Sequence, residues 1–357
     1  MAATALLVAL AVAAAFYLGA FAYLGVTFFL MRGHTEPRSR LATARSFLFE
    51  LLCVVIVQPL LPFFYVVGRR MGGGSGVPIV FVHGYFQNRV DFLYLARAFR
   101  RAGLGPLFGF NYPFLASVEE NARRLGRFCA EVRAETGATE VDLVCHSLGG
   151  LVALEHVRQD AAAHAAGDAA HVRRCVTVAA PHAGVMFRGP ILGASGRDLR
   201  RGSELLRTHE AWRAGVPVLS IFSSHDNVVH PKLTSALAAR GGEDIEVAHF
   251  GHFGILFSRT VARNIATFLG ASRAAAEASV RVEEAGGVAE GGGVSVRVEE
   301  AGGVANAEGT AGGGVAAAEG TAGGDVAEAG EEPAKNGVDD GGEPALIGVA
   351  EAGEAKR

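Results

Sequence analysis

The apolar and polar positions of the chain divide it into three parts. Residues 2–31 contain no charged side chain, the middle of the chain alternates short apolar runs with longer segments of helical spacing, and the last part is dominated by Gly, Ala, Val and Glu. This division predicts an N-terminal membrane region over residues 1–70, a globular domain over residues 76–270 and a low-complexity tail over residues 274–357. The tail has almost no aromatic residues, so we expect it to be disordered.

The N-terminal part is long and apolar enough to cross a bilayer. A helix over residues 2–31, at about 1.5 Å per residue, exceeds the ~30 Å hydrocarbon core. A second apolar stretch over residues 51–68 is interrupted by Gln58, Pro59 and Pro62, and the prolines remove backbone donors. We expect two transmembrane helices; one helix with an interfacial or re-entrant second segment, and a cleaved signal peptide, are the alternatives.

Positive charge between the two apolar stretches bears on orientation. The arginines there, against the single acid Glu36, are Arg32, Arg38, Arg40 and Arg45. The positive-inside rule would place this loop in the cytoplasm, and two spans would then leave the domain facing the periplasm or exterior. Arg69 and Arg70, just after the second stretch, oppose that orientation. On the balance of these charges we expect anchoring in the inner or plasma membrane, with the domain facing the periplasm or exterior.

The middle of the chain predicts an α/β domain. Strands that alternate with helices favour a mostly parallel sheet with helices on both faces. The expected strands are residues 78–82, 106–110, 141–146, 175–178, 216–222 and 244–248, and the expected helices are residues 91–102, 117–136, 148–159 and 255–268. The segment 184–215 is too long for a plain loop and contains a helix-like stretch, 198–213, so we expect a small cap there, with an ordinary connecting helix as the alternative.

A serine follows the third predicted strand in a pattern typical of a nucleophile elbow. The sequence Cys145-His146-Ser147-Leu148-Gly149 matches G-x-S-x-G except that Cys stands at the first glycine. Such a sharp strand-to-helix turn raises a serine hydroxyl above the sheet. A compact thiol is compatible with the tight turn, whereas a larger side chain would clash. Ser147 as an ordinary helix N-cap is the alternative.

Two residues that follow later strands complete a catalytic set with the serine. Asp226 and His252 come after Ser147 in the chain order Ser, Asp, His. An imidazole takes the proton from the attacking hydroxyl, and a carboxylate orients that imidazole. Asp244 and Glu246 are alternative acids, and His249 is the alternative base.

An oxyanion that forms during such a reaction needs donors. The amide of Leu148, at a helix N-terminus, is one candidate, and the amide of Tyr85 in the loop after the first strand is the other. Gly84 gives that loop its freedom. We expect supporting roles for His83, Gly84, His146 and Gly149.

The motifs together resemble the α/β-hydrolase superfamily, in particular its bacterial triacylglycerol lipase and esterase branch. The similarity covers about 195 residues and is carried by residues 82–84, 142–150, 180–184, 224–229 and 251–254. It implies hydrolysis of carboxylic esters through an acyl-enzyme, with no metal and no organic cofactor.

The charge and composition of the chain indicate what it is expected to bind. The tail carries a net charge of about −11 and the rest of the chain about +8, spread over scattered arginines, which indicates an anionic membrane surface and not a nucleic acid. Four Cys at irregular spacing predict neither a disulfide framework nor a zinc site. We expect a hydrophobic acyl ester or lipid as substrate, with the aromatic patches Tyr85-Phe86 and 108–114 as candidate pocket walls. An acyltransferase or thioesterase using the same triad, and a catalytically weak binding scaffold at the membrane, are the competing functions.

Overall fold

The computed structural model describes residues 2–35, 39–65, 68–165, 171–186 and 191–271. The expected tail, residues 274–357, lies outside the described residues. All statements below concern the described ranges.

Two helices form the N-terminal part of the chain. Helix α1 spans Ala2–Met31 and α2 spans Arg40–Val57. Helix α2 begins at Ser39, whose hydroxyl accepts from the N–H of Ala42 at 3.0 Å, so a polar cap starts it well before the apolar stretch predicted from residue 51. Beyond Val57 the prolines tighten the chain into a 3₁₀ helix, η1 (Gln58–Tyr65).

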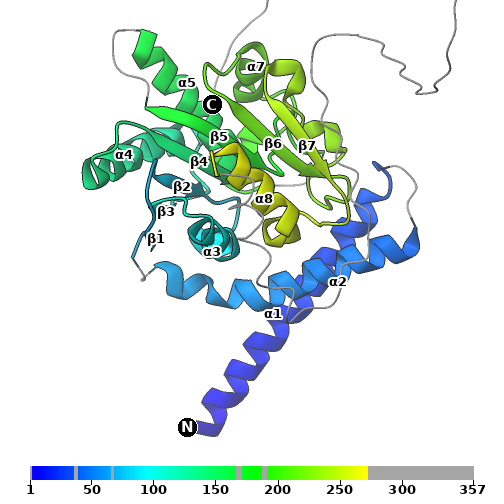
Figure 1. Ribbon diagram of the computed structural model, residues 1–357. Helices are drawn as coiled ribbons and strands as arrows, with labels where there is room; N and C mark the ends of the chain where they lie inside the picture. The colour runs from blue at the N-terminus through cyan, green and yellow to red at the C-terminus, as the bar shows by residue number, and fades with distance from the viewer. Residues whose placement is uncertain (1, 36–38, 66–67, 166–170, 187–190, 272–357) are drawn as a thin grey trace, which may run out of the picture. The chain divides into compact units, whose positions relative to one another are not determined.

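The domain is built on a seven-stranded sheet, drawn in Figure 1. Its strands are β1 (Arg70–Gly72), β2 (Ile79–Val82), β3 (Leu107–Phe110), β4 (Val141–His146), β5 (Val172–Val178), β6 (Val218–Ser223) and β7 (Glu243–Val247), in the order β1-β3-β2-β4-β5-β6-β7. All neighbouring pairs are parallel except β1 and β3. The six predicted strands are confirmed. The edge strand β1 was not predicted, because three residues of mixed polarity carry no alternation.

Helices cover both faces of the sheet, as predicted. They are α3 (Leu93–Arg101), α4 (Val118–Thr136), α5 (Leu148–Ala165), α6 (Gly193–Asp198), α7 (Glu204–Ala211) and α8 (Arg259–Phe268), with short 3₁₀ turns η2 (Arg89–Phe92), η3 (Lys232–Ser235), η4 (Ala238–Arg240) and η5 (Gly254–Phe257). The alternation along β2 shows the two layers. Phe81 packs in one core cluster with Phe99 of α3 and Ile265 of α8, and Val82 packs in the other with Leu125 of α4 and Leu151 of α5.

Figure 1 shows α3 and α8 on one side of the sheet and α4 and α5 on the other. Each fully buried Leu or Phe side chain contributes about 1.5–3 kcal/mol to such a core. This sheet order and layering are the α/β-hydrolase architecture that the sequence resemblance implied.

Helix α7 covers the middle of the predicted helix 198–213, and helix α6 ends at Asp198, where the prediction began. The chain breaks between them at Gly202, which has φ +73°, and the hydroxyl of Ser203 accepts from the N–H of Leu206 to begin α7. Leu199 and Leu206 pack in the core cluster of α4 and α5. Whether the segment 184–215 covers a pocket stays a prediction.

Candidate active site

Ser147 stands at a strained turn between β4 and α5. Its φ is +52°, in the left-handed region that residues other than glycine seldom adopt. The turn is fixed on one side by the N–H of Ser147, which donates to the carbonyl of Val178 at 2.9 Å, and on the other by the N–H of Gly150, which donates to the carbonyl of Ser147 at 2.9 Å. Strain of this kind persists only where surrounding contacts impose it. The elbow predicted from the sequence is therefore present as backbone geometry.

Close backbone contacts explain two of the glycines around the elbow. A Cβ added at Gly149 would lie 2.3 Å from the carbonyl oxygen of Val82, and one added at Gly84 would lie 2.9 Å from the Cβ of Ser147. The start of α5 and the loop after β2 thus approach each other to a distance that no side chain permits. This approach brings the loop that contains Tyr85 beside Ser147.

Cys145 takes the place of the first motif glycine without disturbing the turn. Its side chain is fully buried in the core cluster that α4 and α5 cover, and its residue pairs with Val82 across the parallel strands β4 and β2. The thiol therefore fills core volume under the elbow.

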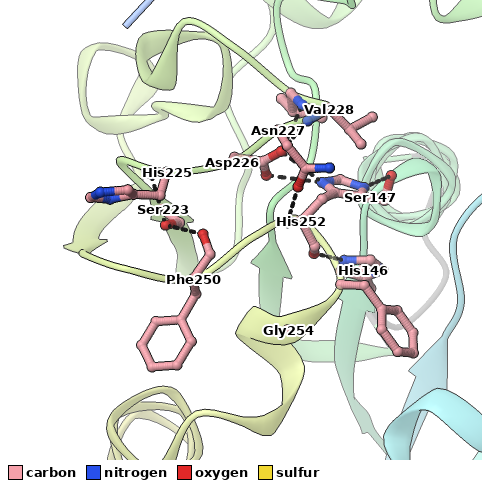
Figure 2. Close-up of polar contacts among 12 residues, drawn as sticks. His146, Ser147, Ser223, His225, Asp226, Asn227, Val228, Phe250, His252 and Gly254 are labelled. Carbon is pink, nitrogen blue, oxygen red and sulfur yellow. Dashed lines mark hydrogen bonds and ion pairs between the residues drawn. The ribbon is translucent and has the colours of Figure 1, made fainter. Parts of the chain in front are cut away.

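The three residues expected to form a triad lie within hydrogen-bonding distance of one another. The Nε2 atom of His252 is 2.9 Å from the Oγ of Ser147, and its Nδ1 atom is 2.9 Å and 3.1 Å from the two carboxylate oxygens of Asp226. Figure 2 shows the imidazole between the hydroxyl and the carboxylate. Ser147 and Asp226 come from the ends of β4 and β6, and His252 comes from the loop after β7, so one edge of the sheet gathers all three.

Asp226 is held by its own loop. One of its carboxylate oxygens accepts from the N–H groups of Val228 and Val229, at 2.8 Å and 2.7 Å. These donors stabilise the carboxylate and fix its orientation toward the imidazole.

The surroundings of His252 favour the protonated form of its ring. Burial of the ring lowers the pKa of His252, but the charge of Asp226 and the hydrogen bond to it act in the opposite direction and prevail, so the pKa is raised above 6.5. The same carboxylate that orients the ring therefore also stabilises its cationic form.

The alternative acids and the alternative base lie in other contacts. Asp244 accepts from the N–H groups of Leu237 and Ala238, at 2.8 Å and 3.0 Å, and Glu246 binds Lys232 at 2.7 Å. The N–H of His249 donates to the ring of His225 at 3.0 Å. Of the candidate acids and bases, the structure brings only Asp226 and His252 to the serine.

The two backbone amides expected to be oxyanion donors have no hydrogen-bond partner in the part of the chain that the structure describes. Within the described residues, neither the N–H of Tyr85 nor that of Leu148 donates a hydrogen bond. The neighbouring N–H of Gly84 is already bound to Oε1 of Gln87 at 2.7 Å, so this loop is pinned one residue before Tyr85. Leu148 is the first residue of α5, where N–H groups have no partner inside the helix.

His146 connects the loop after β2, which is expected to supply an oxyanion donor and is termed the oxyanion loop, to the loop that contains His252. Its Nδ1 atom is 2.8 Å from the Oε1 of Gln87, and its Nε2 atom is 2.9 Å from the carbonyl oxygen of His252. Burial, followed by the nearby charge of His252, holds the pKa of His146 well below its usual range. Its role here is to tie two loops together, as Figure 2 shows for the contact with His252.

His83 contacts the backbone on both sides of its ring and so supports the loop after β2. Its Nδ1 atom is 2.9 Å from the carbonyl oxygen of Gly84, and its Nε2 atom accepts from the N–H of Tyr112 at 3.3 Å. Burial lowers the pKa of His83 to about 4, so the ring is neutral at physiological pH. Both nitrogens are engaged with the backbone, which is a structural use of this residue.

Three residues in this network were not predicted from the sequence. They are Gln87, Asn227 and Glu50. The Oδ1 atom of Asn227 accepts from the N–H of His252 at 2.9 Å, next to the triad acid in the chain. A signal existed for Asn227 and Gln87, since each is an amide within three residues of a candidate site residue. Glu50 had a different signal, a lone acid against an apolar stretch.

The aromatic patches named from the sequence separate into two environments. Phe108 and Phe110 are buried in the core. Phe114 instead packs with Tyr85 and Phe86 in a cluster with ring centroids 4.7–5.1 Å apart, and Phe86 is 58% exposed. The hydroxyl of Tyr85 donates to the carbonyl of Leu192 at 2.7 Å. The oxyanion loop therefore carries an exposed apolar surface beside the elbow.

The part of the chain that the structure describes contains no group of three or more His, Cys, Asp or Glu arranged to hold a metal ion. The arrangement around Ser147 can instead activate a hydroxyl by proton transfer.

Comparison with known proteins gives the following findings. A family model described as a domain of unknown function (DUF7379) matches residues 68–190, about a third of the chain. Among curated proteins, no sequence matches the chain.

Several solved structures are similar to the chain. Lipase B of Aspergillus fumigatus is 16% identical, with a TM-score of 0.48, over 60% of this chain and 59% of that one. The mature lipase BlEst2 of Bacillus licheniformis is 15% identical, with a TM-score of 0.45, over 56% of this chain and 94% of that one. A monoacylglycerol lipase of Paleococcus ferrophilus is 17% identical, with a TM-score of 0.42, over 54% and 96%. The similar region thus spans less than two thirds of the Aspergillus enzyme, and the fold assignment rests on the sheet order and the elbow.

Proposed function

We propose that this protein is a serine hydrolase that cleaves carboxylic esters through an acyl-enzyme. The observation that carries the proposal is the continuous line from the Ser147 hydroxyl through His252 to Asp226, with contacts of 2.9 Å at each step.

In the first half of the reaction, the Oγ of Ser147 attacks the ester carbonyl carbon while its proton passes to Nε2 of His252. The carbonyl oxygen becomes an oxyanion that accepts from the N–H groups of Tyr85 and Leu148, each of which is free to donate. The C–O bond to the alcohol then breaks, the alcohol takes the proton from Nε2, and an ester of Ser147 remains.

In the second half, water gives a proton to Nε2 and its oxygen attacks the acyl carbon. The tetrahedral intermediate collapses, the proton returns to Oγ, and a carboxylic acid leaves. Asp226 keeps Nδ1 of His252 protonated and stabilises the transient imidazolium in both halves.

We further propose a hydrophobic acyl ester, such as a lipid, as substrate. The partly exposed cluster of Tyr85, Phe86 and Phe114, in which Phe86 is the exposed ring, gives an acyl chain an apolar surface close to the nucleophile. Helix α1 contains a 22-residue segment, Leu10–Met31, that is long and apolar enough to cross a membrane. An anchor of this kind would keep the site close to a supply of such esters.

The proposal is tested by labelling the full-length, detergent-extracted protein with a fluorophosphonate probe. Wild type is expected to form a covalent adduct, and Ser147→Ala is expected to form none. Ser220→Ala is the matched control, since Ser220 is a buried serine in the sheet whose hydroxyl donates to the carbonyl of Ser235. Folded wild-type protein that is not labelled and hydrolyses neither short nor long acyl esters would favour a binding scaffold. Transfer of the acyl group to an added alcohol or thiol would identify an acyltransferase.

A further inference from the structure

A carboxylate from the N-terminal part of the chain reaches the loop that contains His252. Glu50 lies in the middle of α2, is only 2% exposed, and accepts from two consecutive backbone donors. The N–H of Phe253 donates to its Oε1 at 2.7 Å, and the N–H of Gly254 donates to its Oε2 at 2.5 Å. Both donors directly follow His252 in the chain.

The loop has the shape that this carboxylate requires. A Cβ added at Gly251 would lie 2.5 Å from the Oε2 of Glu50, and one added at Gly254 would lie 2.8 Å from the same atom. Glycine on both sides of His252-Phe253 therefore leaves the space that Glu50 fills. Two hydrogen bonds to one buried carboxyl group, from consecutive N–H groups, fix the backbone of this loop closely.

Three side chains together hold the backbone of the catalytic histidine. Asn227 accepts from the N–H of His252, His146 contacts its carbonyl oxygen, and Glu50 accepts from the next two N–H groups. The first two come from the sheet edge, and Glu50 alone comes from α2. The side-chain NH₂ group of Asn227 donates to the hydroxyl of Thr27 in α1 at 2.8 Å, so α1 also contacts this network.

Helix α2 is docked on the domain along one face. Its buried residues recur at helical spacing, and they are Ser46, Glu50, Cys53 and Val57. Cys53 and Val57 belong to the same core cluster as α3 and α8, and the ring of Phe49 packs against that of Phe250 at 5.8 Å. The opposite face is apolar and exposed, with Leu48, Leu52 and Ile56.

We propose that Glu50 is a positioning residue of the active site, which holds the His252 loop from helix α2 so that the imidazole meets Ser147. This inference rests on the proposed hydrolase function. It makes α2 a part of the catalytic domain, because a helix whose mid-point carboxylate binds that loop cannot at the same time cross a bilayer away from the domain. The negative charge of Glu50 also contributes to raising the pKa of His252.

The test is the variant Glu50→Gln in the full-length protein, with kcat, KM and a pH profile on a soluble ester. A Gln oxygen accepts one of the two N–H groups and its NH₂ opposes the other, so the loop loosens. Misplacement of a catalytic group by about 1 Å costs on the order of 100-fold. We expect kcat to fall about 10- to 100-fold with KM changed less than threefold. Burial raises the pKa of Glu50 to about 7, so its charge is present mainly above that pH, and its loss should move the acid limb only slightly to lower pH. Asp226, His146 and His230 also face this ring and are unchanged.

The matched control is Cys53→Ala, which removes a buried side chain from the same face of α2 but no hydrogen bond to the loop. It should lower the free energy of unfolding, keep kcat within threefold of wild type and leave the position of the acid limb unchanged. Equal losses in both variants would mean that Glu50 only docks the helix, and wild-type kinetics in Glu50→Gln would overturn the proposal. If Glu50→Gln does not fold, Glu50→Asp is measured, since the shorter carboxylate cannot reach both donors; wild-type kcat there overturns the proposal equally. Inactive wild-type protein would instead overturn the hydrolase function.

Discussion

The Nδ1 atom of His252 lies 2.9 Å from one carboxylate oxygen of Asp226 and 3.1 Å from the other. Because both oxygens are near the same ring nitrogen, the carboxylate fixes the tautomer with Nδ1 protonated and leaves Nε2 to face Ser147. The same contact raises the pKa of His252 above 6.5. In the proposed mechanism the neutral imidazole is the base, so activity should rise as pH passes upward through that raised pKa.

Asp226→Asn is therefore expected to act on both rate and pH dependence. We expect kcat to fall about 10²- to 10⁴-fold, since the tautomer is no longer imposed and the imidazolium loses its counter-charge. The acid limb of the kcat/KM profile should shift to lower pH, because the charge that raises the pKa of His252 is gone. Steady-state hydrolysis of a soluble ester from pH 5 to 9 measures both effects.

The control for this variant is Asp244→Asn. Asp244 also accepts two backbone N–H groups, but near the start of β7 and away from the serine. It should keep the wild-type pH profile even if the protein becomes less stable. A profile for Asp226→Asn that coincides with wild type would show that Asp226 is not the orienting acid.

Gln87 is expected to support the oxyanion loop. Its Oε1 atom is bound to the N–H of Gly84 and lies 2.8 Å from the ring of His146. Gln87→Ala removes both contacts and frees the segment that presents the N–H of Tyr85. Loss of one oxyanion donor costs roughly 10²–10³ in rate, so a loosened donor should lower kcat about 10- to 100-fold with a smaller change in KM.

Gln159→Ala provides the comparison, because Gln159 binds Glu155 on helix α5 at 2.9 Å and has no contact with the loop. Its kcat should stay within twofold of wild type. If Gln87→Ala also keeps wild-type kcat, the loop does not depend on this amide and the assignment of Tyr85 as a donor loses its support.

The strands that carry the site could be predicted from the sequence because each has a strong local pattern. The run Val141–His146 has apolar residues at four of its six positions and is followed directly by a serine, and the final helix has apolar residues at regular spacing. The helix expected from residue 198 begins only at Glu204, because the apolar spacing of 198–213 continues through Gly202, whose positive φ is a property of the folded backbone. Helix α6 was not predicted.

The contacts that support the site could not be read from spacing. Glu50 and Phe253 are 203 positions apart, and Gln87 and His146 are 59 apart, so only the packed domain brings them together. In the sequence, Glu50 directly precedes the apolar stretch over residues 51–68. The helix in fact begins ten residues earlier, at Arg40, which places Glu50 at its centre.

Cys145 invites the question whether the usual glycine would improve the elbow. The thiol is fully buried beneath the turn, and the left-handed φ of Ser147 already exists with Cys in place. Cys145→Gly is thus expected to lower the free energy of unfolding by about 1–3 kcal/mol, from the lost side chain and the added backbone entropy, without raising kcat. Urea unfolding and ester hydrolysis measure the two quantities.

A parallel variant, Cys175→Ala, removes the buried thiol of the neighbouring strand β5. It should also destabilise the protein and leave kcat unchanged. A tenfold gain of kcat in Cys145→Gly would show that the native residue holds the elbow away from its best geometry.

Two segments, Leu10–Met31 and Arg40–Phe63, are long and apolar enough to cross a membrane, and the proposed docking of α2 would leave only α1 to do so. If α1 is the single span, Arg32, Arg40, Arg45 and the Arg69-Arg70 pair all lie on the same side of it, and the positive-inside rule places them in the cytoplasm together with the domain. Two spans would place the domain on the opposite side. With α1 as the single span, the exposed apolar face of α2 would rest in the membrane interface, as in a monotopic membrane protein.

Two exposed threonines separate these topologies. Thr4 precedes the candidate span of α1, and Thr139 lies in the loop between α4 and β4. The four native cysteines are buried, so a membrane-impermeant maleimide should report only an introduced thiol. In spheroplasts we expect Thr4→Cys to be labelled from outside and Thr139→Cys to be labelled only after lysis. Labelling of both before lysis would support two spans and would require α2 to leave the His252 loop, which the Glu50 contacts oppose.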